Sequence, residues 1–140
     1  MSEAIKQVWK SQSNSRIIAS APSNSAADLL ASKLLKQVPK SEIIRFYARS
    51  RLERQVPGDL KPISRFHSSH FDDSLEALKR YRIIVVTLVT AGKLASLGFD
   101  EHFSHLFVDE AGHATEPEAI VPLSGVLKKG GQLVLAGNLQ

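Results

Sequence analysis

The sequence predicts an α/β fold in which helices cover both faces of a parallel β-sheet. Short apolar runs alternate along the 140 residues with segments whose apolar positions recur at helical spacing. The runs are apolar at consecutive positions, as strands buried on both faces require. No run approaches the roughly 18 apolar residues of a membrane span, so we expect no membrane partner. The chain has no cysteine, which excludes disulfides and thiol catalysis.

Four elements are expected in the first third of the chain. Pro22 closes the first apolar run, the next three residues are N-cap types, and Pro39 ends the helix that follows. The expected elements are a short helix over 4–9, a strand over 17–21, a helix over 26–36 and a strand over 43–47. The segment 49–69 has no clear periodicity and is expected to form a long loop.

The remainder of the chain continues the alternation. Its strongest strand pattern is a run of five β-branched residues that ends at Thr87. The expected elements are a helix over 74–80, a strand over 83–87, a short helix over 91–97, a strand over 106–108, a helix over 116–126, a turn over 128–131 and a strand over 132–136.

Charge divides the chain into two halves. Through Arg65, twelve Lys and Arg stand against five Asp and Glu, and from Phe66 onward six stand against nine, so balances of +7 and −3 make up the net +4. The densest basic stretch, 33–65, includes Arg45, Arg49, Arg51 and Arg54. This asymmetry indicates one surface for a polyanion and another for a cation, and a solvated face with a loop is the alternative.

Polar residues follow four of the expected strands. Ligands of open parallel sheets bind beyond the carboxyl ends of the strands. The residues at these ends are Pro22, Ser23, Asn24 and Ser25, then Thr87 and Thr90, then Asp109 and Glu110, and finally Gly137. We therefore expect all of them along one edge of the sheet.

The carboxylates of Asp109 and Glu110 are costly at the exit of a buried strand unless a cation or hydrogen-bond donors compensate them. Hydrated Mg²⁺ suits such a site, because it binds one or two carboxylates together with phosphate oxygens and water. Asp109 would then face the metal while Glu110 orients a water for attack on a γ-phosphate. Taken alone, the dipeptide favours a plainer interpretation, an N-cap pair for the next helix.

Several segments together resemble the superfamily-one RNA helicases of the Upf-like group. The segment 107–113, with 115–118, resembles motif II, and its Gly-His variant is most similar to the RNA-silencing branch of Armitage and the Moloney-leukaemia-virus-ten helicases. The segment 21–30 resembles motif Ia, 86–94 the next nucleic-acid-contacting motif, and 133–137 the start of motif III. The motifs occur in the family's order and span most of the chain.

The resemblance implies a RecA-like domain and a role for each matched residue. Asp109 would hold Mg²⁺ largely through water, Glu110 would be the general base of ATP hydrolysis, and Gly137 would lie at the ATP site. The residues implied to contact the RNA backbone are Pro22, Ser23, Asn24, Ser25, Thr87 and Thr90. Contacts to phosphate and sugar carry no sequence information, which suits movement along any RNA.

The resemblance also implies an activity and a setting. The family couples ATP hydrolysis to 5′-to-3′ movement on RNA, here in RNA-mediated silencing, in the cytoplasm and ribonucleoprotein granules, with silencing proteins as partners. The chain departs from the family's pattern in two motifs. It contains no G-x-x-x-x-G-K-[ST] phosphate-binding loop, since Gly92-Lys93 is followed by Leu94, and Asn138-Leu139 stands where motif III of the family continues with Asp-Pro.

Residues 1–140 are therefore expected to form part of a first motor domain, from motif Ia to the start of motif III, without the P-loop strand or a second motor domain. We expect this chain to bind RNA weakly and to hydrolyse ATP negligibly. A non-catalytic truncated paralogue that only binds RNA or partners is the alternative.

Histidine spacing leaves a third hypothesis open. Two H-x-x-H pairs, His67/His70 and His102/His105, could supply four imidazoles to a zinc ion. A structural zinc site without cysteine is unusual, so the helicase interpretation is favoured.

Overall fold

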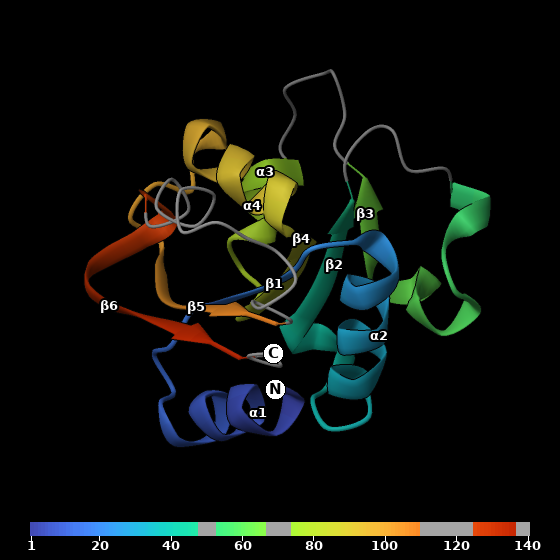
Figure 1. The fold of residues 1–140 in the computed structure, drawn as a ribbon, viewed down its shortest axis with the longest axis horizontal. Helices are drawn as coiled ribbons and strands as arrows, with labels where there is room; N and C mark the ends of the chain where they lie inside the picture. The colour runs from blue at the N-terminus through green and yellow to red at the C-terminus, as the bar shows by residue number, and fades with distance from the viewer. Residues whose placement is uncertain (48–52, 67–73, 110–124, 137–140) are drawn as a thin grey trace.

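The computed structural model describes residues 1–47, 53–66, 74–109 and 125–136, and its core is a six-stranded parallel sheet (Figure 1). The strands are β1 (Ile17–Ala21), β2 (Ile43–Tyr47), β3 (Ser64–Phe66), β4 (Ile83–Thr87), β5 (Phe103–Val108) and β6 (Leu127–Leu135). They lie in the order β3-β2-β4-β1-β5-β6, and every neighbouring pair is parallel. The fold class expected from the sequence is therefore confirmed.

Helices cover both faces of this sheet. On one face lie α1 (Ser2–Ser11) and α2 (Asn24–Leu35), and on the other lie α3 (Ser74–Leu78) and α4 (Leu88–Leu94). Short 3₁₀ helices occupy Lys40–Glu42, Glu53–Gln55, Gly58–Ile63 and Ala95–Leu97. Among the helices of the described ranges, none is long and apolar enough to cross a membrane.

Two apolar clusters, one on each face, hold the layers together. In β1, Ile17 and Ala19 belong to the cluster under α1 and α2, whereas Ile18 belongs to the cluster under α3 and α4. Successive side chains of a strand point to opposite faces, so a strand with helices on both sides is apolar throughout. This explains why consecutive apolar runs, rather than alternating ones, marked the strands in the sequence.

Strands β1, β2 and β4 have the bounds that the sequence predicts. Helices α2 and α4 both begin earlier than expected. Helix α2 begins at Asn24 because Ser23 is its N-cap, and α4 begins at Leu88 because Thr87 is its N-cap. In each case a side-chain oxygen accepts a hydrogen bond from a backbone N–H of the first turn. The polar residues after β1 and β4 are thus part of the helix starts.

Two expectations about secondary structure were wrong. The segment 49–69, expected to form a long loop, contains 3₁₀ helices and β3, which pairs with β2. The expected turn over 128–131 lies inside β6. Phe103 of β5 is paired with Leu127 of β6, and the next pair is His105 with Gln132, so β6 advances five residues while β5 advances two. The extra residues form an irregularity in which Gly130 has a φ of 81° that disfavours other residues. The helix expected over 116–126 lies mostly outside the described residues.

Candidate nucleic-acid interface

The register of the sheet brings the carboxyl ends of β4, β1 and β5 together. Ala21, the last residue of β1, is paired with Thr87, and Ser20 is paired with Val108. The backbone N–H of Asp109 donates to the Ser20 carbonyl at 2.8 Å. The segments that follow these three neighbouring strands therefore begin side by side at one edge of the sheet, as the sequence predicts.

The first of these segments is the start of α2. Ser23 Oγ accepts from Ala26 N at 3.1 Å, so this hydroxyl caps the helix. Ser23 and Ser25 are exposed, and Pro22 and Asn24 are half-buried. The capping interpretation of these residues is thus confirmed for Ser23, and the segment still presents polar side chains to solvent.

The second segment is the start of α4. Thr87 Oγ1 accepts from Thr90 N at 3.3 Å and lies 3.1 Å from Thr90 Oγ1. Thr87 is half-buried, whereas Thr90 is 4% exposed. Of the two threonines expected at an RNA surface, Thr87 is the accessible one, and Thr90 lies behind it as its hydrogen-bond partner.

The third segment begins with Asp109, which is half-buried at the exit of the fully buried strand β5. A half-buried aspartate at this edge of the sheet suits Mg²⁺, which binds one or two carboxylates and keeps several waters. Within the described part of the chain no group of three His, Cys, Asp or Glu forms a metal cage. Glu110 and Gly137 lie outside the described residues.

A buried polar network lies directly behind the start of α2, and the sequence did not reveal it. Arg45 of β2 is 0% exposed, and its Nε donates to Asp28 Oδ1 at 2.9 Å. Its Nη2 donates to Asn24 Oδ1 at 3.0 Å, and its Cζ lies 3.9 Å above the ring centroid of Tyr47. The expectation that Arg45 belongs to a surface for a polyanion is therefore wrong: its charge is buried and paired.

Tyr47 completes this network from the end of β2. Its hydroxyl donates to Asp28 Oδ1 at 2.6 Å. Burial, followed by the hydrogen bond to Asp28, raises the pKa of Tyr47 to about 12, so the phenol stays protonated. One sequence signal could have found the network, because a single arginine interrupts the apolar run of β2 and needs an acidic partner.

The histidines do not support the zinc hypothesis in the described residues. His102 packs edge-on against Phe99 and Phe103 of one core cluster. His105 stacks on Phe107 of the other cluster, and its Nδ1 lies 2.8 Å from Ser104 Oγ. The two rings thus contact aromatic groups on opposite faces of the sheet, and His67 and His70 lie outside the described residues.

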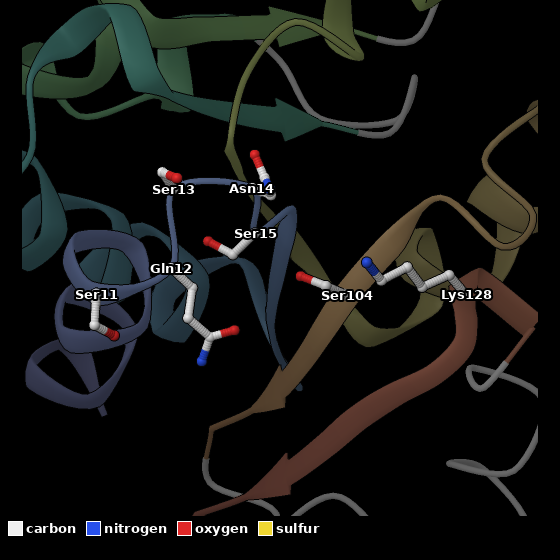
Figure 2. A pocket seen from close by; sticks show the side chains of 7 residues that line it. All are labelled: Ser11, Gln12, Ser13, Asn14, Ser15, Ser104 and Lys128. Atoms are coloured by element: carbon white, nitrogen blue, oxygen red, sulfur yellow. The ribbon is translucent and has the colours of Figure 1, made fainter.

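A polar cavity of about 330 Å³ lies at the opposite edge of the sheet. Figure 2 shows its lining, which comes from the end of α1, the loop between α1 and β1, and the amino-terminal parts of β5 and β6. The lining residues are Ser11, Gln12, Ser13, Asn14, Ser15, Ser104 and Lys128. None of the residues that the sequence assigns to RNA, ATP or Mg²⁺ is among them, so the candidate site and this cavity are separate.

A parallel sheet with helices on both faces and polar residues at its carboxyl edge is the architecture of RecA-like domains. A family model described as "AAA domain" matches residues 64–140, and the chain belongs to this family. The resemblance to superfamily-one helicases of the MOV-10 and Armitage branch is also confirmed by curated relatives.

Three relatives illustrate this. The chain is 47% identical to "Putative helicase MOV-10" of Gallus gallus over 99% of its own length and 16% of the relative's. It is 50% identical to "Putative helicase mov-10-B.1" of Danio rerio, covering 97% and 14%, and 31% identical to "Probable RNA helicase armi" of Drosophila melanogaster, covering 97% and 13%. The chain thus spans about a sixth or less of these relatives.

Solved structures share the fold. The UvsW helicase from Bacteriophage T4 matches with a TM-score of 0.62 and 15% identity, over 99% of this chain and 42% of that one. The restriction-modification enzyme LlaGI matches with a TM-score of 0.58 and 15% identity, over 98% and 14%. At this identity the likeness concerns the fold alone.

Proposed function

We propose that this chain supplies the RNA-contacting edge and the magnesium carboxylates of an ATP-dependent RNA helicase motor. The observation that carries the proposal is the register that places Ala21 opposite Thr87 and Ser20 opposite Val108. That register sets the start of α2 and Thr87 beside Asp109. An RNA-contacting surface and a metal carboxylate are therefore adjacent, as an enzyme that couples hydrolysis to movement requires.

The RNA contacts are made to the backbone. The accessible groups in the segment after β1 and at Thr87 are small hydroxyls and an amide at helix starts, which suit phosphate and sugar oxygens. The expected residues are Pro22, Ser23, Asn24, Ser25 and Thr87, with Thr90 acting through Thr87. Binding is therefore independent of RNA sequence.

At the neighbouring site Asp109 would hold Mg²⁺ largely through water. The metal and ATP supply an electrophilic γ-phosphate when bound, Glu110 would orient and deprotonate the attacking water, and Gly137 would border the phosphates. The wider role that we propose, from the resemblance, is 5′-to-3′ translocation in RNA-mediated silencing, in the cytoplasm and its granules, with silencing proteins as partners.

An RNA-binding titration tests the proposal. Fluorescence anisotropy of a labelled single-stranded RNA should show weak, salt-dependent binding, and Ser25→Glu should weaken it about tenfold because the carboxylate repels phosphate. An acidic residue in the first turn of a helix is otherwise stabilising, so the variant stays folded. Ser41→Glu, an exposed serine in Lys40–Glu42 at the amino edge, is the matched control and should bind like the parent. Equal binding by both variants would contradict the proposed surface.

A non-catalytic RNA-binding module is the second candidate. It is favoured by the absence of a G-x-x-x-x-G-K-[ST] pattern from these 140 residues, because nothing in them offers the usual cradle for the β- and γ-phosphates. We expect no phosphate release above background in a malachite-green assay. RNA-stimulated release that Glu110→Gln abolishes would establish catalysis by the chain itself.

A further inference from the structure

The guanidinium of Arg45 connects strand β2 to the first turn of helix α2. Its Nε donates to Asp28 Oδ1 at 2.9 Å and its Nη2 to Asn24 Oδ1 at 3.0 Å. Its Nη1 donates to the carbonyl of Phe46 at 2.8 Å and lies 3.4 Å from that of Val85. One side chain thus fixes the helix start against two strands of the sheet.

Arg45 itself does not reach a ligand. It is 0% exposed and its charge is balanced by Asp28, which is 5% exposed. A buried ion pair of this kind adds little net stability compared with apolar residues, and its best-attested use is to specify one arrangement of the groups around it. The ion pair of Arg45 and Asp28 therefore acts by holding a neighbouring, more accessible group in one orientation.

That group is the side-chain amide of Asn24. A guanidinium has only donors, so the Asn24 atom facing Nη2 is the acceptor Oδ1. This leaves Nδ2, with its two N–H groups, on the side of the amide away from Arg45. Within the described part of the chain no acceptor is hydrogen-bonded to Nδ2, and Asn24 is half-buried at the protein surface.

The side-chain oxygen of the neighbouring Ser23, like that of Asn24, accepts a hydrogen bond from within the protein. Ser23 Oγ accepts from Ala26 N within the helix cap, and its O–H remains a donor. Asn24 and Ser23 thus each use an acceptor within the protein and keep an N–H or O–H donor for a ligand. Such a surface suits a ligand rich in acceptors, and phosphodiester oxygens are acceptors only.

We propose that Arg45 is a positioning residue that turns the amide donors of Asn24 toward the phosphodiester backbone of RNA. This inference rests on the proposed function. It assigns to the RNA site a buried residue, Arg45, that does not itself contact RNA. A planar fork can hold Asp28 and Asn24 at once, whereas the single nitrogen of a lysine holds one of them. Orientation of the amide before binding removes part of the entropic cost of making the contact.

A double-mutant cycle tests the coupling. Arg45→Lys should weaken binding of a single-stranded RNA about fivefold, and Asn24→Ala should weaken it by a similar factor, as expected for the loss of one oriented hydrogen bond. If Arg45 acts through Asn24, then Arg45→Lys has almost no further effect in the Asn24→Ala background. Independent losses that multiply in the double variant would overturn the proposal.

A second variant separates positioning from stability. Asn24→Asp keeps an oxygen toward Arg45 and places a carboxylate in the first turn of α2, so the unfolding temperature should be unchanged or higher. Its outward oxygen is an acceptor, so RNA binding should fall below that of Asn24→Ala. If binding merely followed stability, Asn24→Asp would bind at least as well as the parent, and that result would also overturn the proposal.

Arg82→Lys is the matched control. Arg82 donates to Trp9 O, Gln12 O and Ser15 Oγ at the opposite edge of the sheet, so its loss perturbs the fold without touching α2. We expect a lower unfolding temperature and unchanged RNA affinity. If the parent chain and Ser25→Glu bind RNA equally weakly, the proposed function fails and this inference with it. If Ser25→Glu loses affinity but the cycle shows no coupling, only this inference fails.

Discussion

Strands β1 and β6 both pair with β5, yet their surroundings are opposite. All five residues of β1 are buried, and the strand has parallel neighbours on both sides. Strand β6 pairs only with β5 within the described residues, and Leu133 and Leu135 are 43% and 52% exposed. Leu133 nevertheless lies in register with Ile18, since each is paired with Leu106. We call such a set of paired residues on neighbouring strands a row.

This difference shows that an apolar sequence does not by itself make a strand part of the core. Ile18 is covered because it belongs to the cluster that α3 and α4 close, whereas Leu133 lies one strand beyond that cover. Exposed apolar residues on an edge strand favour pairing with other chains. The same row of the sheet thus contains a buried position that stabilises the fold and an exposed position at which we expect contact with other chains.

Among side-chain truncations, the largest expected effect on stability comes from the buried end of this row. Ile18→Ala should lower the free energy of unfolding by about 2–5 kcal/mol, because it removes a fully buried side chain and leaves a cavity. Leu133→Ala is the matched change and should cost less than about 1 kcal/mol, since its side chain is already partly in water. Urea denaturation of both variants measures the difference, and equal costs would contradict it.

Two histidines, one in β5 and one directly before it, are expected to make the fold sensitive to pH. Burial and the nearby Lys128 lower the pKa of His105, and burial with Lys79 lowers that of His102. The unfolded chain therefore binds more protons than the folded one below the ordinary histidine pKa of about 6.5. Stability is complete above that pH and falls as the pH drops through it.

Unfolding temperatures between pH 7.5 and 5.5 check this expectation. His105→Gln should flatten the decline, because glutamine cannot take up the extra proton. Exposed carboxylates change little over this range, so they do not mask the effect. A parent chain that is equally stable at both ends of the range would contradict the burial of neutral histidine.

The smallest effect on stability is expected at the exposed end of β6. Leu135→Lys should change the free energy of unfolding by less than about 0.5 kcal/mol, because the side chain is half exposed. It should reduce self-association, since a charge on an edge strand opposes pairing with another chain. Light scattering against concentration measures this. Val108→Lys, one strand inward in the same row, is the contrasting change and should prevent folding.

Local patterns predicted much of the architecture and of the candidate site. Apolar runs located β1, β2 and β4 with their bounds, because residues buried on both faces must be apolar throughout. Capping residues placed Ser23 near the start of α2. The rule that ligands collect at the carboxyl edge placed Asp109 beside the residues after β1 and β4, since the sheet is parallel.

The features that were missed depend on contacts between distant residues. β3 has no apolar run of its own and is a strand because Ser64 and Phe66 pair with Arg45 and Tyr47 of β2. The Phe66 ring also stacks on Tyr47 with 5.1 Å between centroids. The glycines of β6 indicated a turn, but pairing with β5 on both sides of them produced an irregular strand.

By itself, the sequence determined the alternation of helices and strands outside β3, the parallel sheet and the polar groups that end its strands. Those features follow from the hydrophobicity and capping preferences of neighbouring residues, which are local properties. Only the tertiary structure decided that Arg45 is buried against Asp28 rather than exposed to a polyanion, and that Leu133 is exposed while Ile18 is not. Burial and ion pairing depend on what lies across the sheet, and no local pattern contains that information.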